Sequence, residues 1–115
     1  MSIAEISKNY HAEKRGNCAM SVAYGFARSK GKTEEESLTF AEQFRNFGGG
    51  RAPDGYCGAL HAAKTLCPAR ADNIEQLFKE GAQGCTRCKE IRPQAIISCN
   101  RCVELAGEAL DKAST

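Results

Sequence analysis

Four of the seven cysteines in this 115-residue chain stand in two C-x-x-C pairs near the C-terminus. The pairs are Cys85-Thr-Arg-Cys88 and Cys99-Asn-Arg-Cys102, separated by ten residues. Two such pairs in one short segment can present four thiolates to one point, which suits tetrahedral zinc or an iron–sulfur cluster. We therefore predict Cys85, Cys88, Cys99 and Cys102 as ligands of an iron–sulfur cluster, with a structural zinc ion or no metal as the alternatives.

Cysteines also stand at the expected beginnings of helices. Cys18, Cys57 and Cys99 each lie at or just inside the N-terminus of a segment with helical spacing. Unpaired backbone N–H groups and the helix dipole stabilise a thiolate there, which lowers the pKa of the thiol and raises its reactivity. We therefore predict Cys18 and Cys57 as redox-active residues. The alternative is a packing role, because cysteine is among the most buried residue types.

Thiol–disulfide chemistry without a metal is the alternative, either at the second C-x-x-C pair or at a pair that includes Cys18 or Cys57. A C-x-x-C at a helix start lowers the pKa of its first thiol, which here is Cys99. The pair shares a helical face with apolar residues further along the chain, namely Val103, Ala106, Ala109 and Leu110. Cys99 and Cys102 should therefore point inward, as metal ligands or a protected dithiol would. Cys67, directly before Pro68, is the cysteine that we predict to be structural.

Composition limits the class of protein to which these cysteines belong. Sixteen Lys and Arg against 14 Asp and Glu leave a net charge of +2, too small and too evenly spread to indicate nucleic-acid binding. No apolar stretch approaches the length of a membrane span, and the first 14 residues lack the apolar run of a signal peptide. We expect a cytoplasmic protein. In that reducing compartment seven cysteines indicate metal binding or redox chemistry rather than permanent disulfides.

Signals for helix beginnings and ends recur along the whole chain. Ser2 and Thr33 each precede a Glu by three residues, which is capping-box spacing, and Asn17 is a good N-cap. Behind these caps apolar residues repeat at helical intervals, at positions 3–10, 19–27 and 40–47. Three helices are therefore predicted before the glycine run 48–50, which ends the third.

Three further helices are predicted after that glycine run. The first spans 57–66, the second is capped at Asp72 and ends at Gly81 or Gly84, and the last runs from about Ser98 to the C-terminus. The segment 85–98 is typical of a loop, and nothing alternates with period two for long enough to demand a strand. We predict an all-α fold, a single compact domain over residues 1–115 with about five or six short helices.

Taken together, the cysteines and their neighbours resemble a known family. Asn17-Cys18-Ala19 opens a helix, Phe47-Gly48-Gly49-Gly50 and Cys57-Gly58-Ala59-Leu60 follow, and the C-terminal cysteines complete the series. This order is similar to the redox-active protein family named for its C…GCAxxG…C…C signature, from about the second helix to the C-terminus. The chain departs from the pattern at Ala62, where a glycine is usual. That departure bears on how closely the helices pack there.

The resemblance implies a redox role without a defined reaction. It extends to a domain of split-Soret cytochromes, in which a non-haem iron–sulfur centre accompanies the haems. By that analogy Cys18, Cys57 and the C-terminal cysteines are carried over as redox-active residues or cluster ligands. We expect electron transfer or redox sensing with a redox partner protein, and a carrier rather than an enzyme, since no acid–base constellation of substrate size is present. A metal-free thiol–disulfide protein and a zinc-stapled interaction module are the alternatives.

Overall fold

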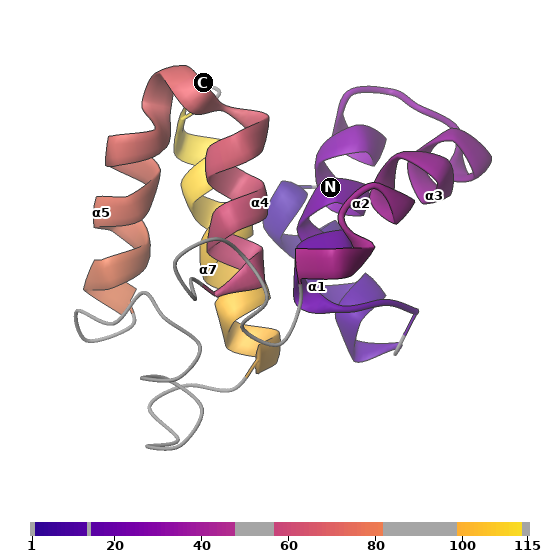
Figure 1. The fold of residues 1–115 in the computed structure, drawn as a ribbon, viewed down its shortest axis with the longest axis horizontal. Helices are drawn as coiled ribbons and strands as arrows, with labels where there is room; N and C mark the ends of the chain where they lie inside the picture. Colours follow the sequence, from indigo (N-terminus) through magenta and orange to yellow (C-terminus); the bar gives the residue numbers. More distant parts are fainter. Residues whose placement is uncertain (1, 14, 48–56, 82–98, 114–115) are drawn as a thin grey trace.

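Figure 1 shows the fold in a computed structural model, which describes residues 2–13, 15–47, 57–81 and 99–113. Six α-helices and two short 3-10 helices occupy these residues. They are α1 (Ile3–Ala12), α2 (Cys18–Ser29), α3 (Glu34–Glu42), η1 (Arg45–Phe47), α4 (Gly58–Leu66), η3 (Pro68–Arg70), α5 (Ala71–Gly81) and α7 (Cys99–Ala113). These four ranges contain no strand, so the predicted all-α class is confirmed.

Side-chain caps begin the first three helices where the sequence predicts them. Ser2 Oγ and Asn17 Oδ1 each accept a hydrogen bond from the backbone N–H three residues later, at 3.1 and 2.8 Å. Thr33 and Glu36 form a complete capping box, in which each side chain accepts from the other residue's backbone N–H. Each cap satisfies N–H groups that have no partner inside the helix.

Two helices differ from their predicted bounds. α3 ends at Glu42, and its last turn tightens because Phe44 N–H bonds to the carbonyl three residues back rather than four. The chain continues there as η1. α5 begins at Ala71, directly after the 3-10 turn that Pro68 opens, so Asp72 lies inside the first helical turn instead of capping it. The glycine run 48–50 and the predicted loop 85–98 lie outside the described residues.

One hydrophobic core joins the six α-helices. α2 packs against α1, α3, α4 and α7, while α7 packs against α1, α2, α4 and α5, so these two helices lie at its centre. Figure 1 shows α4, α5 and α7 on one side of the molecule and α1, α2 and α3 on the other. The largest fully buried apolar residues are Val22, Leu60, Ile74, Phe78, Val103 and Leu110. Shared burial of this kind makes the described helices one compact unit.

The core includes Ala62, where the sequence departs from the signature that it resembles, and its side chain is fully buried. A methyl group is therefore accommodated where α4 enters the core. Within the described ranges, no helix combines the length and apolar character needed to cross a lipid bilayer.

The first and last helices are tied together. Asp111 near the end of α7 accepts hydrogen bonds from the backbone N–H groups of Ile3 and Ala4, at 3.0 and 3.2 Å. The carboxylate thus caps the N-terminus of α1 from across the fold, where the helix dipole favours a negative charge. Gly107 permits this close approach, because a Cβ there would lie 2.5 Å from the Ala4 Cα.

A group of aromatic residues fixes the turn between α1 and α2. The rings of Tyr10 and Tyr24 stack with centroids 4.6 Å apart, and the Arg15 guanidinium lies 5.1 and 5.0 Å from the two ring centroids. The turn residue Gly16 leaves room for the Tyr10 hydroxyl. These contacts hold the turn that leads to Asn17, the residue that caps the beginning of α2.

Candidate functional site

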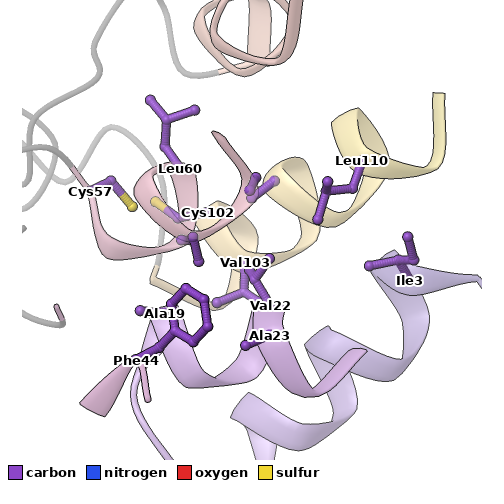
Figure 2. Packing of buried hydrophobic residues seen from close by; sticks show 14 of the residues in the cluster. Ile3, Ala19, Val22, Ala23, Phe44, Cys57, Leu60, Cys102, Val103 and Leu110 are labelled. Atoms are coloured by element: carbon purple, nitrogen blue, oxygen red, sulfur yellow. The ribbon is translucent and has the colours of Figure 1, made fainter. Parts of the chain in front are cut away.

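Three cysteines that are far apart in the sequence meet in the structure. Cys18 is the first residue of α2, Cys57 is the N-cap of α4, and Cys102 lies in the first turn of α7. The Cys57 thiol is hydrogen-bonded to the thiols of both Cys18 and Cys102. Figure 2 shows the sulfur atoms of Cys57 and Cys102 facing one another within the core. We call Cys18, Cys57 and Cys102 the thiol cluster.

The members of the thiol cluster differ in exposure. Cys57 is 6% exposed and Cys102 is 3% exposed, whereas Cys18 is only partly buried. Leu60 and Val103, each close in sequence to one of the buried cysteines, are fully buried and belong to the same core. The cluster therefore runs from two buried cysteines to a third that is only partly buried.

Asn17 positions the partly exposed end of the cluster. Its Oδ1 caps α2 through Met20 N–H, and its Nδ2 donates to the Arg45 carbonyl of η1 at 2.7 Å. The carbonyl of Asn17 accepts from the Ser21 hydroxyl at 2.7 Å. One side chain thus fixes the beginning of α2, where Cys18 lies, against the segment that leads toward Cys57. The sequence predicts the cap, but not the bond to Arg45, which joins residues 28 positions apart.

The packing of three helix beginnings explains why the thiols meet. α2, α4 and α7 pack pairwise against one another. Each cysteine stands at, or one turn inside, the beginning of its helix. The first backbone hydrogen bonds of α2 and α4 are regular, with Ser21 N–H to Asn17 O and His61 N–H to Cys57 O both at 2.9 Å. Regular helix starts therefore present the thiols at one place.

The electrostatics of Cys57 are opposite to the expectation from its helix N-terminus. The hydrogen bond to Cys102 and burial raise the pKa of the Cys57 thiol to about 12. The Cys18 thiol and the Leu60 backbone N–H act in the other direction, but the first two causes outweigh them. The backbone N–H at the beginning of α4 therefore acts in the predicted direction, but the net shift of the Cys57 pKa is upward, opposite to the prediction.

The structure adds a contact to one of the predicted ligand residues. Cys102, predicted to act with the other C-terminal cysteines, contacts Cys57 and so belongs to the thiol cluster. Its inward orientation on α7 is as predicted. Cys85 and Cys88 lie outside the described residues, and Cys99 is described only as the first residue of α7, without its side chain. The sequence does not single out Cys102 as the neighbour of Cys57, because the two residues lie 45 positions apart.

The described residues do not by themselves form a metal site. Within them, no three His, Cys, Asp or Glu side chains are arranged to hold a metal ion. Cys67 is the C-cap of α4, at the opposite end of that helix from Cys57. It is partly buried and packs against the core.

Comparisons of the chain with models of protein families, with curated proteins and with solved structures gave no match. The resemblance to the C…GCAxxG…C…C family therefore stays a prediction from the sequence. The chemistry open to the chain therefore follows from the thiol cluster.

Proposed function

We propose that this protein is a redox-active cysteine protein whose centre is the thiol cluster. The observation that carries the proposal is the contact between two buried cysteines, Cys57 and Cys102, whose sulfur atoms face one another in the core (Figure 2). Thiol–disulfide exchange requires such contacts, because one sulfur must reach the sulfur that it attacks. Packing alone does not require thiols here, since fully buried alanines fill much of the same core.

The buried pair supplies a two-electron couple. When Cys57 and Cys102 form a disulfide they lose two electrons and two protons, which reduce one external disulfide to two thiols. Their position inside the core protects the pair from unspecific oxidation, which follows exposure and thiolate character. A protein with these properties acts as a carrier or a sensor of redox state.

An iron–sulfur cluster is the second candidate. The donor type favours it, because thiols from three separate helices converge, and thiolates are the usual ligands of such clusters. A fourth ligand would have to come from outside the thiol cluster, and Cys85, Cys88 and Cys99 are the residues to test. A bound metal would also favour the thiolate form of Cys57. The metal-free couple is the proposal that we favour, because the buried Cys57 and Cys102 already face one another within the core.

Metal analysis and thiol mapping on one preparation test the proposal. The chain is purified without oxygen, its iron, sulfide and zinc contents and visible spectrum are measured, and it is then equilibrated in glutathione redox buffers. After acid quenching and alkylation, mass spectrometry of the peptides locates disulfides. We expect a reversible Cys57–Cys102 disulfide, and Cys67→Ser should leave it unchanged.

Three other results would be decisive. Iron with matching sulfide and charge-transfer absorption would select the cluster candidate instead. Zinc with thiols that stay unreactive would move the protein to the structural class and overturn the redox proposal. Metal-free protein in which Cys57 and Cys102 remain thiols under strongly oxidising glutathione would overturn it as well.

A further inference from the structure

The three cysteines of the thiol cluster differ in exposure, and Cys57 lies between the other two. Cys18 is partly exposed at the first residue of α2, while Cys57 and Cys102 are 6% and 3% exposed. Cys18 is therefore the member of the cluster that is most exposed to an external disulfide in the folded protein. To reach Cys57 or Cys102, the same disulfide would first need an opening of the core between α4 and α7.

Cys57 is the middle member of the cluster. It is hydrogen-bonded to Cys18 on one side and to Cys102 on the other. A sulfur in that position can exchange with both neighbours without a large movement of any helix. The buried pair is thus connected to the surface through a single thiol contact, that between Cys18 and Cys57.

Resting on the redox function proposed above, we propose that Cys18 is the exchanging thiol of the cluster. It accepts oxidising equivalents from an external disulfide and passes them through Cys57 to Cys102. This assigns three roles to three residues: Cys18 meets the partner, Cys57 relays, and Cys57 with Cys102 stores the disulfide.

The relay is balanced in three exchange steps. In the first, the Cys18 thiol attacks an external disulfide RS–SR, forms the mixed disulfide Cys18–S–SR and releases one RSH. In the second, the Cys57 sulfur attacks the Cys18 sulfur as its proton passes to the leaving RS⁻, which forms a Cys18–Cys57 disulfide and releases the second RSH. In the third, Cys102 attacks the Cys57 sulfur, which leaves a Cys57–Cys102 disulfide and returns Cys18 to the thiol.

The partner that this arrangement fits carries an accessible disulfide. Small disulfides and protein disulfides share that chemistry, and the experiment separates them by using oxidised glutathione and a disulfide-linked peptide as probes. Equal rates with both would indicate an open approach to Cys18. A large preference for one probe would show whether the surface around Cys18 admits small disulfides or protein disulfides. With either probe the relay requires the first adduct on Cys18.

The relay is tested by following adducts in time on the full-length reduced chain. Oxidised glutathione is added, samples are quenched with acid and alkylated, and peptide mass spectrometry reports which cysteine carries glutathione. We expect the first adduct on Cys18, followed by the Cys57–Cys102 disulfide. In Cys57→Ser the adduct should stay on Cys18, because the second step is lost.

Cys18→Ser provides the decisive variant and Cys67→Ser its matched control. Without Cys18, formation of the Cys57–Cys102 disulfide should slow by at least about tenfold, since it then depends on opening of the core. Cys67→Ser, which changes another partly buried cysteine, should keep the wild-type rate. Far-ultraviolet circular dichroism checks that each variant is folded.

The failures of the two proposals can be told apart. If the Cys57–Cys102 disulfide forms at the wild-type rate in folded Cys18→Ser, the relay is overturned and the redox couple stands. A first adduct on Cys57 or Cys102 in the wild type would also overturn the relay. If no Cys57–Cys102 disulfide forms even at equilibrium, the redox function itself is overturned.

Discussion

At the scale of single residues, Cys57 shows how contacts override a local signal. A helix N-terminus favours a thiolate, yet the neighbouring Cys102 thiol and burial raise the pKa of Cys57 to about 12. Cys57 therefore rests as a protonated thiol at neutral pH, and it must give up this proton when it attacks a neighbouring sulfur.

The raised pKa of Cys57 predicts a pH dependence of stability. The folded protein keeps a proton that the unfolded chain releases between about pH 9 and pH 12. The stabilisation is thus fully present below pH 9, and the free energy of unfolding should fall above it by about 1.4 kcal/mol per pH unit. Cys57→Ala should lose that part of the slope in urea denaturation of the reduced protein, while Cys67→Ala should retain it. Equal slopes in the wild type and Cys57→Ala would contradict the raised pKa.

Single residues also show what the sequence can reveal about the site. The sequence identifies Cys18 and Cys57 as residues of interest because both begin helices, and it predicts that Cys102 faces inward. It groups Cys102 with Cys85, Cys88 and Cys99, a grouping that stays a prediction, because C-x-x-C spacing reports only local pairs. The contact with Cys57 depends on how α4 packs against α7, which no local pattern contains.

At the scale of elements, local signals predict helix beginnings better than helix ends. Ser2, Asn17 and Thr33 cap their helices through side-chain oxygens, and each cap needs only residues within three positions. The end of α3 is set by a 3-10 turn at Phe44, whose side chain is 6% exposed in the common core. Tertiary burial therefore decides where that helix stops, and apolar spacing alone extended it too far.

The long-range cap of α1 predicts a specific loss of stability. Asp111 serves two backbone N–H groups of α1 and is the side chain that joins the two ends of the described chain. Asp111→Ala should lower the free energy of unfolding by about 1–2 kcal/mol, and Asp111→Asn, which keeps one acceptor, by less. Asp72→Ala, at an exposed aspartate in the first turn of α5, should change it by about 0.5 kcal/mol or less. An Asp111→Ala protein as stable as the wild type would show that the cap contributes nothing.

The close crossing of α1 and α7 leads to a second stability prediction, in which the sign of the change in the free energy of unfolding decides the outcome. Alanine in a helix interior is normally more stable than glycine by about 1 kcal/mol. At Gly107, however, the added Cβ would lie 2.5 Å from the Cα and 2.9 Å from the N of Ala4, and backbone atoms cannot rotate away. Gly107→Ala should therefore destabilise the protein by about 1–3 kcal/mol in urea denaturation. A stabilised variant would show that the two helices separate at no cost.

At the scale of the whole molecule, the site is a consequence of one shared core. α2 and α7 contact most of the other helices, and α4 packs against both. The thiol cluster lies where these three helices begin, so its geometry depends on segments that span residues 18 to 113. The all-α class follows from helical periodicity alone. The cluster requires the complete tertiary arrangement, and this is why the sequence names its members without grouping them.

The shared core also couples the redox state of the proposed buried pair to global stability. A Cys57–Cys102 disulfide would join α4 to α7 and close a loop between positions 45 apart in the sequence. Loss of chain entropy in the unfolded state should then make the oxidised protein more stable than the reduced protein by about 4 kcal/mol. Urea denaturation of the two forms, with peptide mapping to confirm the disulfide, measures the difference, and in Cys102→Ser it should vanish. If the oxidised wild type were instead less stable, forming the bond would have to distort the core, and Cys57 and Cys102 could not store a disulfide without disturbing the helices around them.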